Sequence, residues 1–371
     1  MASSKNPPVL GTRALNRALL ARQLLLQRRA MSAIDVVDHL VGLQAQTPES
    51  PYYALWARLR SFRPDELAAL LVKRQVVRLS LMRSTIHLVS ASDCLALRPV
   101  LQPVQERNLF ASSPYGRQLA GMDLKALVRA GQRLLEERPR TIAELAAALK
   151  ARWPRRDGQA MAYAIRNHLA VVQVPPRGLW GQGGLARGTT AQAWLGRTLG
   201  RDRSPEPMLL RYLGAFGPAG VRDMELWSGL RGLAPAVERL RPRLRVFRDD
   251  RGVELFDLPR APRPHPDTPA PPRFLPDYDN VFLSHADRAR IVDEELRLRH
   301  RTGVALRTCP FLLDGFIAGT WRIDRQRRGA TLTIAPFARV TKRDAVALES
   351  EGARLLEFAA PEDAHDVRLV S

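Results

Sequence analysis

The stretch VVRLSLMRSTIHLVS, residues 76–90, has two runs rich in apolar and β-branched residues on either side of Arg83-Ser84. Two such runs joined by a short turn predict a β-hairpin. Apolar residues before it recur at helical spacing. The predicted helices are Leu15–Arg28, one capped by Ser32, Pro51–Leu59 and Pro64–Leu71. Helices closed by a hairpin are the pattern of a winged helix, a variant of the helix-turn-helix.

The same order of elements recurs after residue 120. Helices are predicted over Leu124–Glu137 and Asp157–Leu169. Between them, Thr141 is placed to cap a helix, with Glu144 at the capping-box position. The strands AVVQV (170–174) and LWGQ (179–182) then flank PPRG and predict a second hairpin.

A third copy follows after residue 204. It has a predicted helix over Glu206–Ala215, a second helix within GPAGVRDMELWSGL (217–230) and a third that begins near Pro235. LRVFRD (244–249) and VELFDL (253–258) flank DRG as the closing hairpin. The alternative is a generic α+β protein in which the hairpins are coincidental.

The pattern changes after residue 258. PRAPRPHPDTPAPP (259–272) holds seven prolines and predicts an extended connector. VALRTCPFLLDGFIAGTWRI then predicts two strands joined at Asp314-Gly315. ATLTIAPFA predicts a third strand, and Asp344–Phe358 a closing helix.

The predicted fold class is α+β, with three tandem winged-helix domains followed by a small C-terminal β-barrel-like domain. A chain of 371 residues is long enough for several domains with ordinary cores. The predicted parts are a first winged helix at 10–112, a second at 120–200, a third at 204–258, a linker at 259–272 and a β-rich domain at 273–362.

The charge of the chain is strongly positive. Its formal net charge is +21 at pH 7, and nearly all the cations are arginine, with lysine only at positions 5, 73, 125, 150 and 342. Arginine binds phosphate bidentately and stacks on bases, so this excess favours a nucleic acid. A GC-rich genome explains arginine over lysine, but not the excess of basic over acidic residues. An acidic protein partner is the other alternative.

Several other classes of protein are poorly supported. No apolar run is long enough to span a bilayer, and no charged-then-apolar leader is present, so we expect a cytoplasmic protein. Cys94 and Cys309 lie far apart in sequence and are expected to be reduced thiols. The histidines and cysteines show no zinc-binding spacing, and GQGGLARG lacks the ending of a phosphate loop. We expect no metal and no cofactor.

Several segments resemble one known family when they are taken in order. They are GLQAQTPESPYYALWARL (42–59), RSTIHLVSASD (83–93), FLPDYDNVFLSHADR (274–288) and DGFIAGTWRI (314–323) with LTIAPFARV (332–340). Their order and spacing resemble the AlkZ/YcaQ-type DNA glycosylases from about residue 13 to about residue 358. One branch of that family carries Gln-apolar-Gln and the other Gln-apolar-Asp. Gln44-Ala45-Gln46 places this chain with the first branch.

The resemblance implies a function on damaged DNA. That branch looks like the enzyme that confers self-resistance to a DNA-crosslinking antibiotic. The implied activity is excision of N7-alkylated guanine from double-stranded DNA by a monomer, including the unhooking of interstrand crosslinks. The implied catalytic residues are Gln44 and Gln46.

The chemistry of glutamine fits such a substrate. Alkylation at N7 makes the guanine cationic, which weakens the glycosidic bond and lets the base leave as a neutral molecule. The enzyme then needs to stabilise an oxocarbenium-like sugar and to place a water beneath C1′. An amide carbonyl accepts a hydrogen bond from that water and points its dipole at the cation, although it is no strong base.

The spacing of the two glutamines bears on where they point. Residues i and i+2 lie about 200° apart in a helix, but they share a face in extended backbone. Pro48 disfavours helix at Thr47. We therefore place Gln44 and Gln46 at a helix end or in the following loop, aimed at a DNA cleft. The alternative is a helix C-terminus at which the amides bond free carbonyls.

The first hairpin supplies the next candidates for DNA binding. Arg83, Thr85 and His87 share one parity, opposite to the apolar Ile86 and Leu88. If the apolar pair faces the core, the three polar side chains face outward, with Ser84 beside them in the turn. His87 is otherwise an ordinary strand histidine that is bonded locally.

Two later segments add further DNA-binding candidates. Tyr278, Asp279 and Asn280 either line the cleft or form a turn. Arg322 is placed to reach a phosphate, whereas its neighbour Trp321 is expected in the core. Tyr52 and Trp56 are expected to pack on a helix, not to stack on bases.

The proposed catalytic stretch contains no lysine, and a bifunctional glycosylase needs an amine to form a Schiff base. A monofunctional enzyme is therefore predicted. The alternative is a non-catalytic winged-helix regulator, which would present convex recognition helices and often dimerises on symmetric sites.

Overall fold

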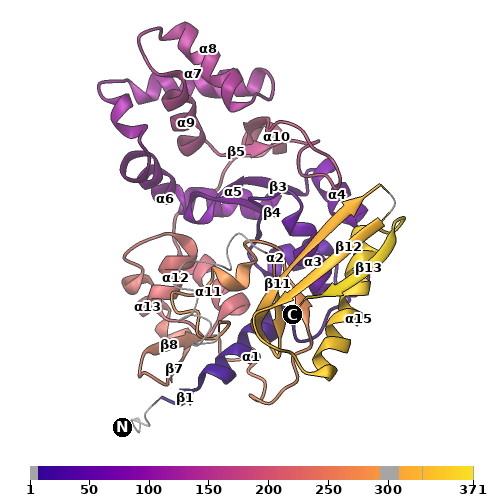
Figure 1. The fold of residues 1–371 in the computed structure, drawn as a ribbon. Helices are drawn as coiled ribbons and strands as arrows, with labels where there is room; N and C mark the ends of the chain where they lie inside the picture. The colour runs from indigo at the N-terminus through magenta and orange to yellow at the C-terminus, as the bar shows by residue number, and fades with distance from the viewer. Residues whose placement is uncertain (1–6, 293–308, 328, 371) are drawn as a thin grey trace, which may run out of the picture.

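The computed structural model describes residues 7–292, 309–327 and 329–370. Helices and three β-sheets make up this part of the chain (Figure 1). In these ranges no helix combines the length and the apolar character that crossing a membrane requires. Both Cys94 and Cys309 are free thiols, and burial raises their pKa values.

The N-terminal helix is shorter than the sequence predicts. Strand β1 (Val9–Leu10) leads into α1, which spans Thr12–Arg22 and not Leu15–Arg28. The helix stops because Leu24 adopts a left-handed backbone conformation, with φ of 58°. The first unit continues with α2 (Ala33–His39), β2 (Leu43–Gln44), α3 (Ser50–Arg58), α4 (Pro64–Val72), β3 (Val76–Ser80) and β4 (Ile86–Ser90).

The second unit begins with α7, which spans Leu124–Glu137 as predicted. The capping box is also confirmed, since the Thr141 hydroxyl accepts from the Glu144 amide at 3.1 Å and the Glu144 carboxylate accepts from the Thr141 amide at 2.7 Å. The other elements are α8 (Ile142–Arg152), α9 (Gly158–His168), β5 (Val171–Gln173) and β6 (Gly188–Thr190).

The second hairpin differs from the prediction. The partner of β5 is Gly188–Thr190, and LWGQ (179–182) is not a strand. The apolar residues of LWGQ pack elsewhere: the Trp180 ring lies 5.0 Å from that of Tyr52 and 5.5 Å from that of Tyr53, measured between centroids. Residues 175–187 therefore form a long loop.

The third unit is followed by the linker. Its elements are α11 (Glu206–Phe216), α12 (Val221–Ser228), α13 (Ala234–Leu240), β7 (Arg245–Asp249) and β8 (Glu254–Asp257), and β1 pairs with β7.

The same order of elements recurs in all three units. A helix leads to a short segment that pairs with the unit's last strand, then to two helices and an antiparallel hairpin. The short segments are β2, Arg140 opposite Gly188, and Ala219 opposite Phe256.

The hairpins of the first two units share one sheet. Its strand order is β2-β4-β3-β5-β6, and Arg78 of β3 lies opposite Gln173 of β5. Strand β2, which carries Gln44, is at the edge of this sheet. Helices between and after the hairpins are α5 (Ala91–Val100), α6 (Gln102–Arg107) with the π-helical turn Asn108–Ser112, and α10 (Ala191–Leu195).

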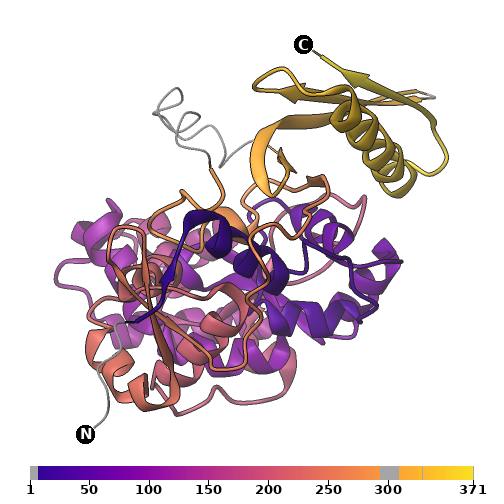
Figure 2. The ribbon, with the colours of Figure 1, turned by 90° about the horizontal axis from the view of Figure 1, so that it is seen from below.

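The C-terminal part contains the third sheet. The predicted turn at Asp314-Gly315 joins β10 (Cys309–Leu313) to β11 (Phe316–Gln326), and residues 304–308 of that prediction lie outside the described residues. Strand β12 (Gly329–Pro336) and helix α15 (Lys342–Ala359) are also confirmed, whereas β9 (Arg273–Phe274) and β13 (Ala364–Leu369) were not predicted. The order β13-β12-β11-β10-β9 leaves the sheet open, as a half-barrel beside α15 (Figure 2).

Buried arginines of the N-terminal region join these parts. Arg22 binds Asp257 at 2.7 and 2.9 Å, and neither side chain reaches solvent. Arg28 binds Glu351 at 2.6 Å, and Arg17 binds Asp314. Removal of one partner from such a pair leaves an uncompensated buried charge. Each pair is neutral as a whole, so the net charge of +21 comes from other cations.

Candidate active site

Gln44 and Gln46 lie in the segment between α2 and α3, after the helix end: Gln44 is in strand β2, and Gln46 is in the bend that follows it. Gln44 belongs to β2 and lies opposite His87 of β4, and the Ala45 amide continues this pairing by donating to the Ile86 carbonyl at 2.8 Å. The side chain of Gln46 turns to the same strand, since its Oε1 accepts from the backbone amide of Ile86 at 3.4 Å. Gln44 is 6% exposed, whereas Gln46 is exposed to solvent.

The free edge of β2 is bound by a side chain from the far end of the chain. The backbone amide of Gln44 donates to Oδ1 of Asn280 at 3.3 Å, and Nδ2 of Asn280 donates to the Gly42 carbonyl at 2.7 Å. Asn280 therefore takes the place of a further strand. The segment that carries Gln44 is fixed on both edges, by β4 and by Asn280.

The residues before Asn280 hold the same region. Asp279 accepts two hydrogen bonds of 2.8 Å from Arg58 of α3, and neither side chain is exposed. Asp277 accepts from the hydroxyls of Thr47 and Ser50. Asp279, predicted as a DNA contact, is therefore bound inside the protein. Tyr278 is partly buried and has φ of 55°.

Arg83 is bonded to the first glutamine. Its Nη2 donates to Oε1 of Gln44 at 2.8 Å, and its Nη1 donates to the Trp227 carbonyl at the end of α12. Removal from water lowers the pKa of the Arg83 guanidinium to about 10, so it stays cationic at neutral pH. The turn of the first hairpin thus joins Gln44 to the third unit.

The other turn residues are bonded internally. The Ser84 hydroxyl donates to Oε1 of Gln105 at 2.9 Å, and the Thr85 hydroxyl donates to the Met82 carbonyl at 3.1 Å. Both residues are partly buried. Within the described residues, neither hydroxyl is bonded to the side chain of Gln44 or Gln46.

His87 does not face outward as the parity of the hairpin predicts. It is 2% exposed, and burial together with the nearby Arg83 charge lowers its pKa to about 3. Its Nδ1 lies 2.9 Å from the Thr85 carbonyl, which only accepts, so Nδ1 carries the hydrogen and Nε2 is an acceptor. The ring opposite Gln44 is therefore neutral.

Other predicted residues are placed apart from the glutamines. Arg322 is exposed on β11 and donates to Asp324 at 2.8 Å, and no contact within the described ranges joins it to Gln44 or Gln46. Trp321 is buried and donates to the Leu275 carbonyl at 2.9 Å, which confirms a core position. The packing positions of Tyr52 and Trp56 are likewise confirmed.

One contributor to the site was missed from sequence. Arg78 of β3 is 2% exposed, and its Nη2 donates to the Ala45 carbonyl at 2.8 Å. Its Nε and Nη1 have no hydrogen-bond partner among the residues that the structure describes, and burial with the nearby Arg177 charge lowers its pKa to about 10. The available signal was a charged residue within the apolar run VVRLS. Arg78 fixes the residue between the two glutamines from the other side of the sheet.

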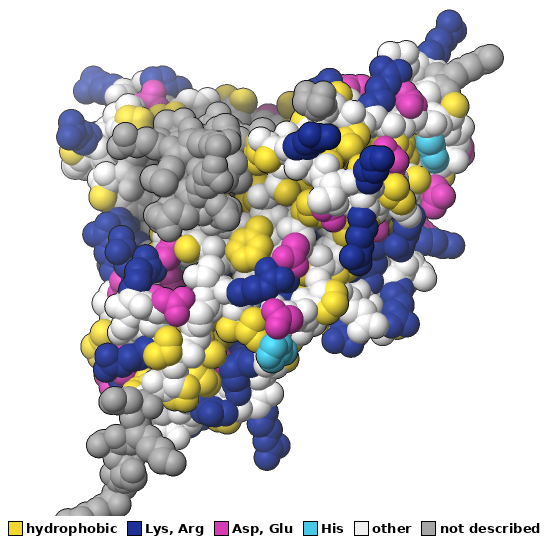
Figure 3. Space-filling model, turned by 60° about the horizontal axis from the view of Figure 1, so that its bottom comes forward, with side chains coloured by type: hydrophobic (Ala, Val, Ile, Leu, Met, Phe, Trp, Pro, Cys, Tyr) yellow, Lys and Arg dark blue, Asp and Glu magenta, His cyan; other side chains and the backbone are white. Residues whose placement is uncertain are grey.

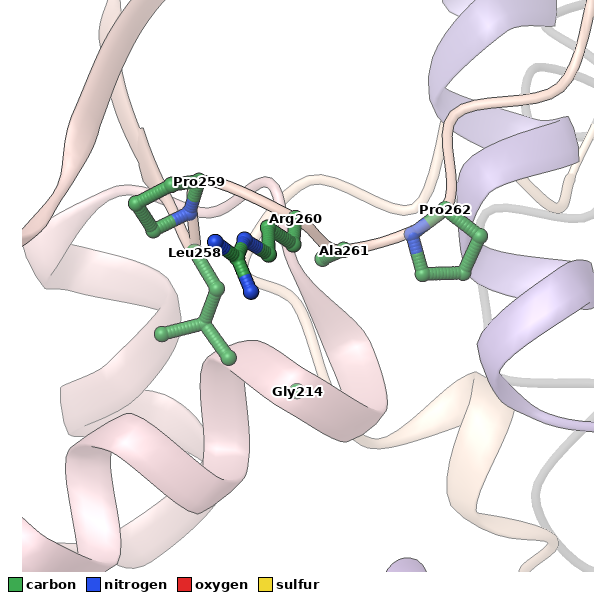
Figure 4. A pocket seen from close by; sticks show the side chains of 6 residues that line it. All are labelled: Gly214, Leu258, Pro259, Arg260, Ala261 and Pro262. Carbon is green, nitrogen blue, oxygen red and sulfur yellow. The ribbon is translucent and has the colours of Figure 1, made fainter.

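A surface pocket lies apart from the glutamines. The pocket in Figure 4 lies between α11 and the linker, and Arg260 is its one ionisable lining residue. Among the described residues, no group of three or more histidine, cysteine or acidic side chains is placed to hold a metal. Figure 3 shows lysine and arginine side chains at many separate places on the visible face.

The third helix of each unit is not an exposed basic helix. Helix α4 exposes Asp65 and Glu66. Helix α9 packs against α6 and the π-helical turn, where Asn108 donates to the Tyr163 hydroxyl at 2.6 Å. Helix α13 exposes Arg239, which is paired with Glu206.

Comparisons with known proteins agree on one family. The family model described as DNA glycosylase AlkZ-like matches residues 37–358. The chain is 26% identical over 372 aligned positions to an interstrand DNA cross-link repair glycosylase from Streptomyces sahachiroi. The alignment covers 91% of this chain and 93% of that protein. The solved structure of Streptomyces sahachiroi DNA glycosylase AlkZ has a similar fold, with a TM-score of 0.78, 19% identity and coverage of 98% and 100%.

Proposed function

Because the chain belongs to the DNA glycosylase AlkZ-like family, whose members hydrolyse N-glycosidic bonds of DNA, we propose that its substrates are cationic N7-alkylguanines in duplex DNA. The segment of Gln44 and Gln46 places the attacking water and faces the developing sugar cation. One observation carries the proposal: Gln44 lies on a strand that is bonded on each edge, and Arg78 holds the carbonyl of Ala45, the residue that leads from Gln44 to Gln46. Such fixed groups cost little reorganisation in the transition state.

The residues around the glutamines favour a substrate that is already activated. Gln44 is surrounded by Asn280, Arg83 and a His87 that is neutral at physiological pH. Asp279 is held in its ion pair with Arg58. None of these described contacts of Gln44 supplies a strong base or acid, so the surroundings suit a base that leaves as a neutral molecule without protonation.

The same chemistry extends to interstrand crosslinks. A crosslink through guanine N7 carries the same positive charge on the base and leaves by the same bond cleavage. The relative from Streptomyces sahachiroi is called an interstrand DNA cross-link repair glycosylase, which supports this extension. Lesions of both kinds are therefore expected substrates.

The three repeated units are proposed to be tandem winged-helix domains, at 10–112, 120–200 and 204–258, joined by the linker to the β-rich domain. Their common order of helix, short pairing segment, two helices and hairpin supports this interpretation. Tyr278 beside Asn280 and the exposed Arg322 remain the proposed DNA contacts.

The non-catalytic regulator is less well supported. A helix-turn-helix regulator presents its third helix to the major groove. Here α4 exposes acidic residues, α9 is packed within the protein, and the exposed arginine of α13 is already paired. These helices are poorly suited to reading bases, whereas an enzyme that reads damage does not need them to do so.

Product analysis on methylated duplex DNA tests the proposal. We expect release of N7-methylguanine and abasic sites that break only on alkali treatment. Since no lysine lies in the stretch of the two glutamines, borohydride is expected to trap no covalent enzyme–DNA complex. Absence of released base, with DNA binding intact, would instead favour the regulator.

A further inference from the structure

The hydrogen bond with Arg83 fixes the orientation of the side-chain amide of Gln44. A guanidinium has only donors, so the Gln44 atom 2.8 Å from Nη2 of Arg83 is the oxygen Oε1. The amide is planar, and its nitrogen Nε2 is then turned away from Arg83. That nitrogen has no hydrogen-bond partner among the residues that the structure describes, and it is not one of the buried unpaired polar atoms.

Gln46 differs from Gln44 in this respect. Its side chain is exposed, and its Oε1 receives only a long hydrogen bond of 3.4 Å from the Ile86 amide. The oxygen of Gln46 thus remains available as an acceptor. Gln44 therefore presents its side-chain nitrogen Nε2, whereas Gln46 presents its side-chain oxygen Oε1.

We propose that Arg83 is a positioning residue that makes Gln44 a hydrogen-bond donor, so that Gln46 supplies the acceptor for the attacking water. This inference rests on the proposed glycosylase function. Gln44 then donates through Nε2 to an oxygen of the lesion nucleotide. The positive charge of Arg83 lies against the Gln44 carbonyl, where it opposes any use of that carbonyl to stabilise a second cation.

The surroundings of Arg83 keep it in this position. Its φ of 53° is in the left-handed region, and its Nη1 is held by the Trp227 carbonyl in the last turn of α12. Helix C-termini attract cations, because their free carbonyls carry partial negative charge. Gly229 packs closely on the turn, since a Cβ added there would lie 3.1 Å from the Arg83 Cα. Arg83 therefore connects α12 to Gln44.

A double-mutant cycle tests whether Arg83 acts through Gln44. Single-turnover excision is measured on one duplex with a single N7-methylguanine, for Arg83→Ala, Gln44→Ala and the double variant. Arg83→Ala is expected to lose about ten- to a hundredfold, as for one hydrogen bond to a charged group, and Gln44→Ala about a hundredfold or more. The double variant is expected to be no slower than Gln44→Ala, because the contact is already lost. Effects that multiply overturn the proposal.

Two further measurements separate positioning from other roles. If Arg83 were a phosphate contact, Arg83→Ala would weaken binding to undamaged duplex and lower the salt slope by about 1; that result overturns the proposal. Arg107 is the matched control, because it donates to the Gly229 carbonyl at the same helix end but does not contact Gln44. Arg107→Ala is expected to keep the parent rate, and an equal loss there overturns the role of Arg83.

Carboxylate variants test the division between the glutamines. Gln44→Glu keeps a partner for Arg83 but loses the donor, so it is expected to lose at least about tenfold in rate. Gln46→Glu keeps an acceptor and is expected to stay active. Equal effects of the two changes, in either direction, overturn the proposal. Arg83→Gly, which suits a positive φ, replaces Arg83→Ala in the cycle if the alanine variant does not fold.

These outcomes distinguish the inference from the function on which it rests. A parent protein that releases no base overturns the proposed function itself. A slow Gln44→Ala variant with multiplicative Arg83 effects overturns only the role given to Arg83. A Gln44→Ala variant at the parent rate overturns both the catalytic role of Gln44 and this inference.

Discussion

Asn280 binds the backbone of the strand that carries Gln44, although 236 residues separate them in sequence. Its side chain accepts from the backbone amide of Gln44 and donates to the Gly42 carbonyl. The site thus depends on the segment that follows the linker, and not on the first unit alone. This contact gives a way to separate positioning of the site from general stability.

Asn280→Ala is expected to slow excision by about tenfold, because β2 loses two hydrogen bonds, each contributing about 1 kcal/mol. Asn16→Ala is the matched control. Asn16 is also buried and donates to two carbonyls, of Arg290 and Gly315, at 2.7 and 2.8 Å, but it is not bonded to the glutamine segment. Both variants should lower the thermal midpoint, and only Asn280→Ala should lower the single-turnover rate. Equal rates for the two variants would contradict the role of Asn280.

The rate of the chemical step is expected to be independent of pH between about pH 6 and 8.5. Glutamine does not ionise, the pKa of His87 is lowered to about 3 by burial, and that of Arg83 is lowered only to about 10. Single-turnover rates at saturating enzyme test this. An inflection inside that range would indicate a titrating base and would count against the glutamine mechanism.

Stability, unlike rate, is expected to depend on pH through His87. Burial lowers the pKa of His87 to about 3 in the folded protein, so between about pH 6.5 and 3 the unfolded chain binds a proton that the folded protein does not. The free energy of unfolding therefore falls as pH falls through this window, by at most about 1.4 kcal/mol per pH unit for one histidine.

His87→Gln tests this dependence, since glutamine stays neutral. Denaturant unfolding of both proteins at several values between about pH 6.5 and 4.5 should give a shallower pH dependence for the variant. His285 is also buried, with a pKa lowered well below its usual range, and it should keep part of the slope. Identical slopes for parent and variant would show that His87 is protonated in the fold.

Duplex DNA is expected to bind with little sequence preference and a steep salt dependence, because the net charge is +21. Contacts with six to ten phosphates would reduce affinity by roughly 10³- to 10⁵-fold between about 50 and 200 mM salt. Fluorescence anisotropy with undamaged duplexes of different sequence measures this. A flat dependence on salt would contradict binding through phosphates.

Local features of the fold could be predicted from the sequence. Helix α7 and the Thr141–Glu144 capping box depend on neighbouring residues, and so does the turn at Asp314-Gly315. The absence of helix at Gln44 and Gln46 follows in part from Pro48. In each case the signal and its cause lie within a few residues of each other.

Features that depend on distant partners could not be predicted in this way. The second hairpin closes at Gly188–Thr190, because Trp180 packs with Tyr52 and leaves the residues between as a loop. Parity places His87 outward, yet it is 2% exposed and lies opposite Gln44 of β2, which is distant in sequence. In the sequence, Arg78 is visible only as a charged residue within an apolar strand. Its hydrogen bond to the Ala45 carbonyl joins residues that are distant in sequence.

The most direct measurement is the single-turnover excision rate of Gln44→Ala and Gln46→Ala on one duplex that carries a single N7-methylguanine. Each variant is expected to be slower by roughly a hundredfold or more, which corresponds to about 2.7 kcal/mol or more of lost transition-state stabilisation. Binding to undamaged duplex should stay at the parent affinity, since phosphate contacts carry most of it. If both variants release the base at the parent rate, these glutamines are structural, and other residues hold the water.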